Sequence, residues 1–232
     1  MATEFSYTVL RSPRRRSVTI KVSPDNRISI SVPPHLSEKK IEEIIRMKSG
    51  WIRKQIEHNQ NRPLLKPKSY ENGETFFFLG EPLRLQIEET EKDNVEVRGE
   101  MLVISISAKR RSMNTAAYAA LCLNRWYQEQ AEKILRERTA VFAAKMKVRP
   151  NSVRIKTVRS RWGSCTRSGN LTYNWKIVMA PSAVLDYVVI HELAHMIHLN
   201  HSQKFWKKVS EFDSRYDEHR KWLHRHAPFL EI

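Results

Sequence analysis

The residues best able to do chemistry in this chain are His191, Glu192 and His195, which form an H-E-x-x-H motif. Positions four apart share one face of an α-helix, so the two imidazoles can hold one metal ion together. Glu192 lies about 100° around the helix from His191 and can reach a water bound to that ion. Two imidazoles, a third ligand and an open position are typical of catalytic zinc, whereas structural zinc has four protein ligands. The motif therefore predicts a metal-dependent hydrolase in which Glu192 is the general base.

An apolar run surrounds the motif and favours a metal site over ordinary core packing. Its members are Val184, Leu185, Val188, Val189, Ile190, Leu193, Ala194, Ile197 and Leu199. They cover nearly every side of the predicted helix, which indicates that the helix is buried. A carboxyl group and two imidazoles are costly to bury unless they are paired or bind a metal.

Two histidines follow the motif, and we expect His201 to be the third ligand. His198 shares the helix face but lies about 10 Å farther along the axis than His191. That distance is too great for two nitrogens that must each lie about 2 Å from one ion. We expect the helix to end near Leu199, with Asn200 in the left-handed conformation, so that the chain can return His201 to the site.

A new helix should follow at once, with Ser202 as its N-cap. The predicted cofactor is one Zn²⁺ ion held by His191, His195 and His201. Imidazole ligands also suit nickel, copper or iron, so another divalent metal is an alternative.

The wider stretch around the motif resembles a known family. The segments that carry the likeness are Ser160–Cys165, Gly169–Leu171, Ala180-Pro181 and the H-E-x-x-H helix. The spacing from His195 to His201 equals that of the metzincins, but His198 replaces their Gly and no Met follows Met196 to form their Met-turn. The chain instead resembles the YgjP-like metallopeptidase family, relatives of the SprT-like zincins, closely from Ser160 through Trp206 and more loosely over most of the chain.

The resemblance implies a zincin-type catalytic domain that holds its metal through His191, His195 and His201 and uses Glu192 as general base. It also places Arg161, Tyr173 and Asn174 near the cleft. These three are therefore candidates to bind substrate and stabilise a developing oxyanion.

A peptide substrate would lie along an edge strand beside the metal-binding helix, since such a strand offers unpaired backbone groups. The candidate strand is residues 171–177. The alternative is an internal strand that buries Trp175 and Ile177, and both interpretations stay open. Trp162 and Trp206 are expected to pack rather than to contact substrate.

The net charge of +16 over 232 residues favours anionic partners. Basic clusters occur at residues 14–16, 39–40, 109–111, 207–208 and 220–221. Two alternatives to a peptidase follow: a hydrolase of nucleoside triphosphates on the same metal site, and a basic nucleic-acid-associated protein. The sequence has no G-x-x-x-x-G-K-S/T loop to bind the phosphates of a nucleotide. In a nucleic-acid-associated protein the zinc would be structural, and such a site needs no general base such as Glu192.

Cys122 and Cys165 are far apart in sequence and suggest no disulfide framework, as expected for a cytoplasmic protein. We expect Cys165 to be a small buried thiol. The N-terminus has no signal-peptide pattern, and no apolar run reaches the roughly 18 residues of a membrane span.

Periodicity predicts an α+β fold, with an N-terminal β-rich lobe over residues 1–110 and the zincin-like catalytic domain over residues 111–232. A hairpin is expected over residues 18–32, then a helix capped by Ser37 and a polar link over residues 59–70. Further strands are expected at residues 75–79, 83–88, 95–98, 102–106, 153–158 and 171–179. A long helix is expected over residues 115–146.

Overall fold

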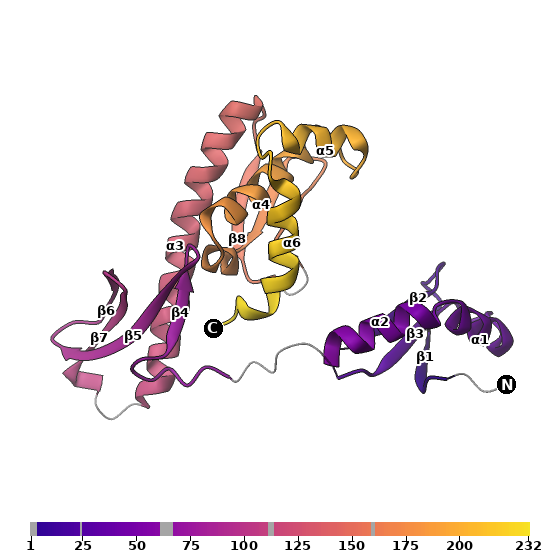
Figure 1. Cartoon of the computed structure of the whole chain (residues 1–232), viewed down its shortest axis with the longest axis horizontal. Coiled ribbons are helices and arrows are strands. Elements are labelled where there is room, and N and C mark those ends of the chain that lie inside the picture. The colour runs from indigo at the N-terminus through magenta and orange to yellow at the C-terminus, as the bar shows by residue number, and fades with distance from the viewer. Residues whose placement is uncertain (1–3, 24, 61–66, 111–113, 159–160) are drawn as a thin grey trace. The chain divides into compact units, whose positions relative to one another are not determined.

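The computed structural model describes residues 4–23, 25–60, 67–110, 114–158 and 161–232 (Figure 1). The expected mixed α+β class is confirmed. The chain divides into two compact units, Met1–Leu64 and Leu65–Ile232. This division differs from the boundary expected near residue 110, because Phe76, Leu85 and Ile104 share one apolar core with Leu193 of the metal-binding helix.

The first unit is a three-stranded sheet that shares a core with two helices. β3 (Ile28–Val32) lies between β1 (Tyr7–Arg11), which runs parallel to it, and β2 (Thr19–Val22), which runs antiparallel. The hairpin predicted over residues 18–32 is confirmed. β1 was not predicted, because the adjacent apolar residues Val9 and Leu10 break the alternation that marks a half-buried strand.

The helical part of this unit begins at Ser37, whose hydroxyl accepts a hydrogen bond from the Lys40 N–H at 3.4 Å. Where one helix was expected, the structure has two, α1 (Glu38–Met47) and α2 (Ser49–Gln60). Both contribute to a small core with the sheet, whose buried members are Ile28, Ile30, Val32, Ile41, Ile45 and Ile52. Part of the polar link that was expected next, residues 61–66, lies outside the described residues.

The second unit begins with a four-stranded sheet in the order β4-β5-β7-β6. Its strands are β4 (Thr75–Phe78), β5 (Glu81–Thr90), β6 (Asn94–Arg98) and β7 (Met101–Ser107), followed by a 3₁₀ turn, η1 (Ala108–Arg110). All four predicted strands are therefore confirmed. Their alternating apolar residues face the common core, as expected for a sheet with one buried side.

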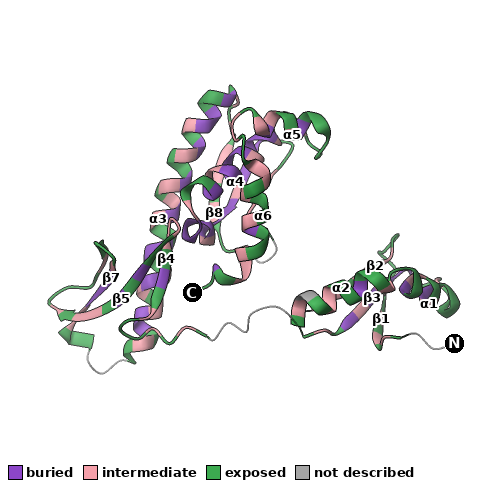
Figure 2. Ribbon diagram, in the orientation of Figure 1, coloured by how far each residue is buried: buried purple, intermediate pink, exposed green. Residues whose placement is uncertain are grey.

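The long helix α3 (Thr115–Met146) has the predicted bounds. Asn114 caps it by accepting a hydrogen bond from the Ala117 N–H at 3.0 Å, and Lys147 ends it in the left-handed conformation. Figure 2 shows buried residues at intervals along α3 and across α4 (Ser182–Ala194). These two helices pack together, and Arg138 of α3 forms a two-point ion pair with Asp186 of α4.

A second small sheet of this unit positions the metal-binding helix. β10 (Asn170–Asn174) is its central strand, with β8 (Ser152–Lys156) parallel on one side and β9 (Gly163–Cys165) antiparallel on the other. The expected strand over residues 171–179 is thus shorter than predicted, because Trp175–Met179 forms the 3₁₀ helix η2. The edge-strand interpretation of residues 171–177 is wrong, since β10 has a partner on both sides.

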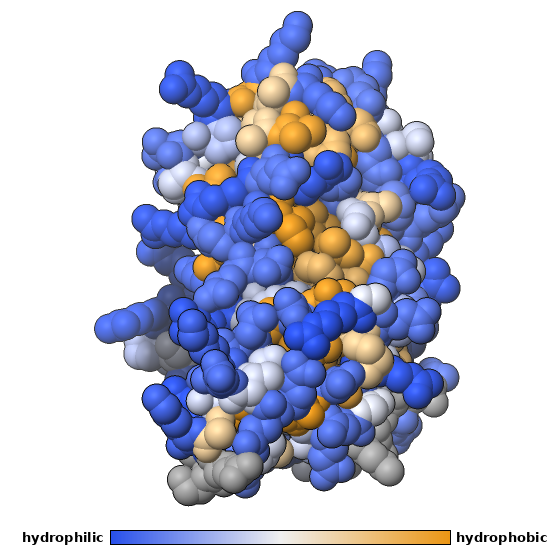
Figure 3. Space-filling view, turned by 90° about the vertical axis from the view of Figure 1, so that its left-hand side faces the viewer, coloured by the Kyte–Doolittle hydropathy of each residue, from blue (hydrophilic) through white to orange (hydrophobic). Residues whose placement is uncertain are grey.

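Three helical segments follow α4: α5 (Gln203–Ser210), α6 (Tyr216–His226) and η3 (Ala227–Phe229). No helix among the described residues combines the length and apolar character that crossing a bilayer requires. The face seen in Figure 3 is mostly hydrophilic, with hydrophobic residues gathered between polar ones along its middle. This surface suits the strong positive charge of the chain.

Candidate metal centre

The first two candidate ligands lie on one face at the end of α4, where His191 is in the last turn and His195 is the C-cap. The apolar residues of this helix bury it, and the rings of His191 and His195 lie one turn apart with centroids separated by 4.9 Å. The helix ends at Ala194, about five residues before the end expected near Leu199. Ile197 and Leu199 extended the apolar pattern that predicted a longer helix, but both are exposed in the structure.

The segment after the helix returns His201 to this face. Its Nε2 lies 3.1 Å from the Nε2 of His191, and one nitrogen from each of the three histidines falls within a group no wider than 4.8 Å. The return does not use a left-handed Asn200, since only Asn26, Tyr70, Leu79 and Lys147 have positive φ among the described non-glycine residues. It is the early end of α4 that leaves enough chain for the reversal.

Hydrogen bonds fix how two of the imidazoles are presented. The Nδ1 of His195 lies 3.2 Å from the carbonyl oxygen of His198, to which it can only donate. The Nδ1 of His191 lies 3.4 Å from the hydroxyl of Tyr187. A protonated Nδ1 leaves Nε2 unprotonated, so His195 offers Nε2 to a ligand. The Nε2 of His191 lies on the side of His201, 3.1 Å from the Nε2 of that residue. His198 contributes its backbone here, in agreement with the expectation that its side chain is not a ligand.

The protonation of the cluster also suits a cation. Burial, together with the nearby His195 and His201, lowers the pKa of His191 to about 3. Burial likewise lowers the pKa of His195. Both imidazoles are therefore neutral at physiological pH, which is the state that binds a metal.

Glu192 is buried and only 5% exposed. Burial raises the pKa of its carboxyl to about 8, and the positive charge of Arg161 acts in the opposite direction. The carboxyl packs against Gly163 of β9, where an added Cβ would lie 2.5 Å from Oε1. Strand β9 can approach Glu192 only because residue 163 has no side chain.

The structure separates the three candidate substrate-binding residues. Tyr173 is fully buried, and its hydroxyl lies 3.3 Å from that of Thr139. Asn174 is also buried, and its amide donates to the carbonyl oxygen of Val158 at 2.8 Å. Both side chains are thus occupied within the core. Arg161 is exposed and acts electrostatically on Glu192, so its role in substrate binding stays a prediction.

Sequence reasoning did not identify two aromatic side chains that touch the cluster, Tyr187 and Phe205. Tyr187 precedes His191 by one helical turn, a spacing that could have indicated the contact. Phe205 comes from the first turn of α5, and its ring centroid lies 4.5–4.9 Å from those of all three histidines. Nothing in the local sequence distinguishes Phe205 from an ordinary core residue.

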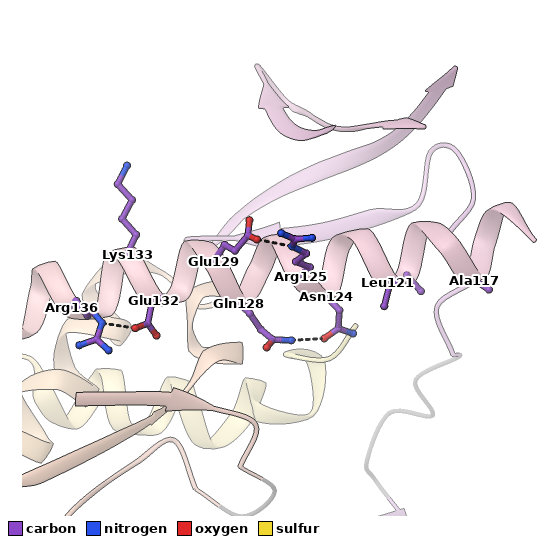
Figure 4. A pocket seen from close by; sticks show the side chains of 10 residues that line it. Ala117, Leu121, Asn124, Arg125, Gln128, Glu129, Glu132, Lys133 and Arg136 are labelled. Carbon is purple, nitrogen blue, oxygen red and sulfur yellow. Dashed lines mark hydrogen bonds and ion pairs between the residues drawn. The ribbon is translucent and has the colours of Figure 1, made fainter. Parts of the chain in front are cut away.

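A surface pocket with a volume of about 950 Å³ lies along one side of α3, away from the histidine cluster (Figure 4). Its polar side chains are engaged with their own helical neighbours, as in the pairs Arg125–Glu129 and Arg136–Glu132. It offers neither a metal-ligand group nor a buried acid or base. The histidine cluster is therefore the better candidate for chemistry.

Comparison with known proteins agrees with this geometry. A family model described as the YgjP-like metallopeptidase domain matches residues 16–226. The protein is a metal-dependent hydrolase of the metallopeptidase class. It belongs to the YgjP-like metallopeptidase family, as the resemblance in sequence implied.

Among solved structures, the chain is similar to the metallopeptidase zymogen abylysin of Pyrococcus abyssi at 19% identity. The likeness has a TM-score of 0.36 and covers 39% of this chain and 93% of that one. No curated protein sequence matches the chain significantly.

Proposed function

We propose that the protein is a zinc-dependent peptidase in which His191, His195 and His201 hold one Zn²⁺ ion and Glu192 is the general base. The observation that carries the proposal is the convergence of three imidazoles beside a buried carboxyl group that the adjacent residue on α4 supplies.

The donor set fits this ion. Two nitrogens bound to one tetrahedral zinc, each at about 2.0–2.1 Å, lie roughly 3.3 Å apart. The Nε2 atoms of His191 and His201 are already 3.1 Å apart. Three imidazole ligands leave one position for solvent or substrate, which is the pattern of a catalytic site.

When bound, zinc supplies Lewis acidity, which lowers the pKa of a coordinated water to about 7 and polarises the attacked carbonyl group. Glu192 accepts a proton from the attacking water and returns it to the leaving amine nitrogen. Its buried position excludes competing solvent from the carboxyl. Arg161 is the candidate to stabilise negative charge that develops on the substrate oxygen.

Strand β9 is the candidate for the substrate-aligning role that one of the two interpretations gave to residues 171–177. The backbone of Trp162 accepts from Asn174 at 2.8 Å, and that of Thr166 donates to Asn170 at 3.0 Å. Because antiparallel ladders alternate, the N–H and C=O groups of Gly163 and Cys165 point away from β10. No other strand among the described residues pairs with this side of β9. An extended peptide that pairs there passes directly beside Glu192.

The charge-based alternatives gain no support from the described residues. No phosphate-binding loop accompanies the basic side chains, and the family favours a peptide substrate. The experiment below nevertheless includes a nucleotide arm, because the same metal site could attack a phosphoanhydride.

The test compares wild-type protein, Glu192→Gln and Glu129→Gln, each stripped of metal and reloaded with zinc. Glu129 lies on α3 and pairs with Arg125, so it is a matched control. We expect an unstructured protein to be fragmented by wild type and by Glu129→Gln, and fragmentation to fall by at least about 10³-fold in Glu192→Gln. Phosphate release from a nucleoside triphosphate without any fragmentation, or fragmentation that does not depend on Glu192, would refute the proposal.

A further inference from the structure

The ring of Phe205 lies against all three candidate ligands. Its centroid is 4.9 Å from that of His191, 4.5 Å from that of His195 and 4.8 Å from that of His201. The side chain is fully buried, so Phe205 links the apolar core to the histidine cluster. The three imidazoles therefore rest on one shared apolar surface.

The next residue, Trp206, contacts the exposed member of the cluster. Its ring stacks on His201 with centroids 5.6 Å apart and planes inclined by 26°. Trp206 itself stacks on Tyr216 at 5.3 Å and 18°, and the guanidinium of Arg220 lies 5.1 Å from its ring centroid. Two residues from the α6 region thus hold the indole that contacts His201.

The three ligands differ in how the protein holds them. His191 and His195 are fixed by hydrogen bonds at Nδ1 and by their places at the end of α4. His201 lies in the segment between two helices and is exposed. Among the hydrogen bonds of the described residues, it takes part only through the Nε2 atom that would bind metal. Its orientation must come from ring contacts.

We propose that Phe205 and Trp206 are positioning residues of the metal site: Phe205 is the floor under the three imidazoles, and Trp206 orients His201 before metal binds. The inference rests on the proposed metal site. It extends that proposal, because it gives the first turn of α5 the task of preorganising a ligand that the chain otherwise leaves free. An unoriented His201 would have to be fixed at the moment of binding, at the expense of metal affinity.

The structure offers a matched control for Trp206. Trp222 is also partly buried and also stacks on a histidine, His226, at 4.2 Å and 11°. That histidine lies outside the metal-binding cluster. Trp206→Leu and Trp222→Leu therefore remove the same kind of contact, one at the site and one elsewhere.

The first measurement uses metal-free protein. The His201 ring protons are identified in NMR spectra by their loss in His201→Ala. We expect them to be shifted upfield by the indole in wild type and in Trp222→Leu, and to return toward free-histidine values in Trp206→Leu. Unshifted His201 signals in wild type would overturn the role of Trp206 whether or not the protein binds metal.

The second measurement is Zn²⁺ affinity by competition with a chelator. We expect Trp206→Leu to weaken binding by about 10- to 100-fold, Trp206→Phe to restore most of it, and Trp222→Leu to change it by less than about threefold. Wild-type protein that binds no divalent metal would refute the proposed function. Metal binding that is equally tight in wild type and in Trp206→Leu would overturn the positioning role alone.

Phe205 is tested through Co²⁺, whose absorption spectrum reports ligand geometry. Phe205→Leu keeps a buried apolar side chain but removes the aromatic ring that contacts the three imidazoles. We expect one Co²⁺ per chain with an altered visible spectrum, whereas Phe212→Leu, a control in an aromatic residue outside the cluster, should leave the spectrum unchanged. An unaltered spectrum in Phe205→Leu would remove Phe205 from the proposal.

Discussion

Gly163 of the edge strand β9 and the buried carboxyl of Glu192 are packed so closely that no methyl group fits on residue 163. A Cβ at residue 163 would lie 2.5 Å from Oε1 and 2.6 Å from Cγ of Glu192. Neither the strand nor the carboxyl could keep its place. The geometry of the candidate base thus depends on a residue that has no functional group.

Gly163→Ala should therefore lower peptidase turnover by roughly 10²-fold, since a displacement of the base by about 1 Å has an effect of this size. The three heavy atoms nearest an added Cβ all belong to Glu192 and none to a histidine, so zinc stoichiometry should stay at one per chain. Turnover and bound zinc are measured on the same preparation.

Gly50→Ala is the control for that substitution, because Gly50 lies in α2 and has no heavy atom within 4 Å of an added Cβ. It should leave turnover unchanged. Full activity in Gly163→Ala would show that Glu192 is not held by this contact.

His201→Ala should weaken zinc binding by at least about 10²-fold, because it removes one of three imidazoles. His198→Ala should bind zinc as wild type does, since His198 contributes only its carbonyl oxygen to the site. Competition with a chelator distinguishes the two variants. Equal affinity in wild type and His201→Ala would exclude His201 as a ligand.

The thiol of Cys165 should be unreactive near neutral pH. Burial, together with the nearby Glu192, raises its pKa from 9.0 to about 11. At pH 8 the thiolate fraction falls on the order of 100-fold below that of an ordinary thiol. In a Cys122→Ser background, alkylation by iodoacetamide should be correspondingly slow and should keep accelerating up to about pH 11. A rate that levels off near pH 9 would contradict the raised pKa.

The ion pair between Arg138 and Asp186 should stabilise the contact of α3 with α4. It has two contacts, one of them 2.6 Å from Nε to Oδ1, and both side chains are largely shielded from solvent. Arg138→Met should lower the free energy of unfolding by about 1–2 kcal/mol. Arg125→Met removes an exposed pair of the same helix and should change it by less than about 0.5 kcal/mol. Urea unfolding of the two variants measures the difference.

Most elements of the fold could be predicted where a local signal repeats over many residues. The helix α3 was predicted with its bounds because its amphipathic pattern continues over many turns. The strand β9 was not predicted, because three residues that include Gly163 and Ser164 have neither alternation nor β-branched side chains. Its position follows from pairing with β10, which only the folded chain reveals.

The candidate site shows the same limit. His191, Glu192 and His195 could be predicted because their spacing on one helix already sets their geometry. The resemblance in sequence implied that Tyr173 and Asn174 lie near the cleft. In the structure both side chains are buried in the core. Phe205 lies in the following helix, and its contact with three imidazoles arises from packing between elements rather than from any spacing along the chain.

The short free edge of β9 has a consequence for selectivity. In the proposed peptidase, pairing through the backbone would not distinguish side chains. The edge would therefore accept almost any sequence that can become extended and would reject a segment whose amides are already bonded in a folded protein. Selection would then act on the conformational state of a target. A protein in the course of synthesis, damage or unfolding would be cut at a loosened segment, while its native copies would be spared.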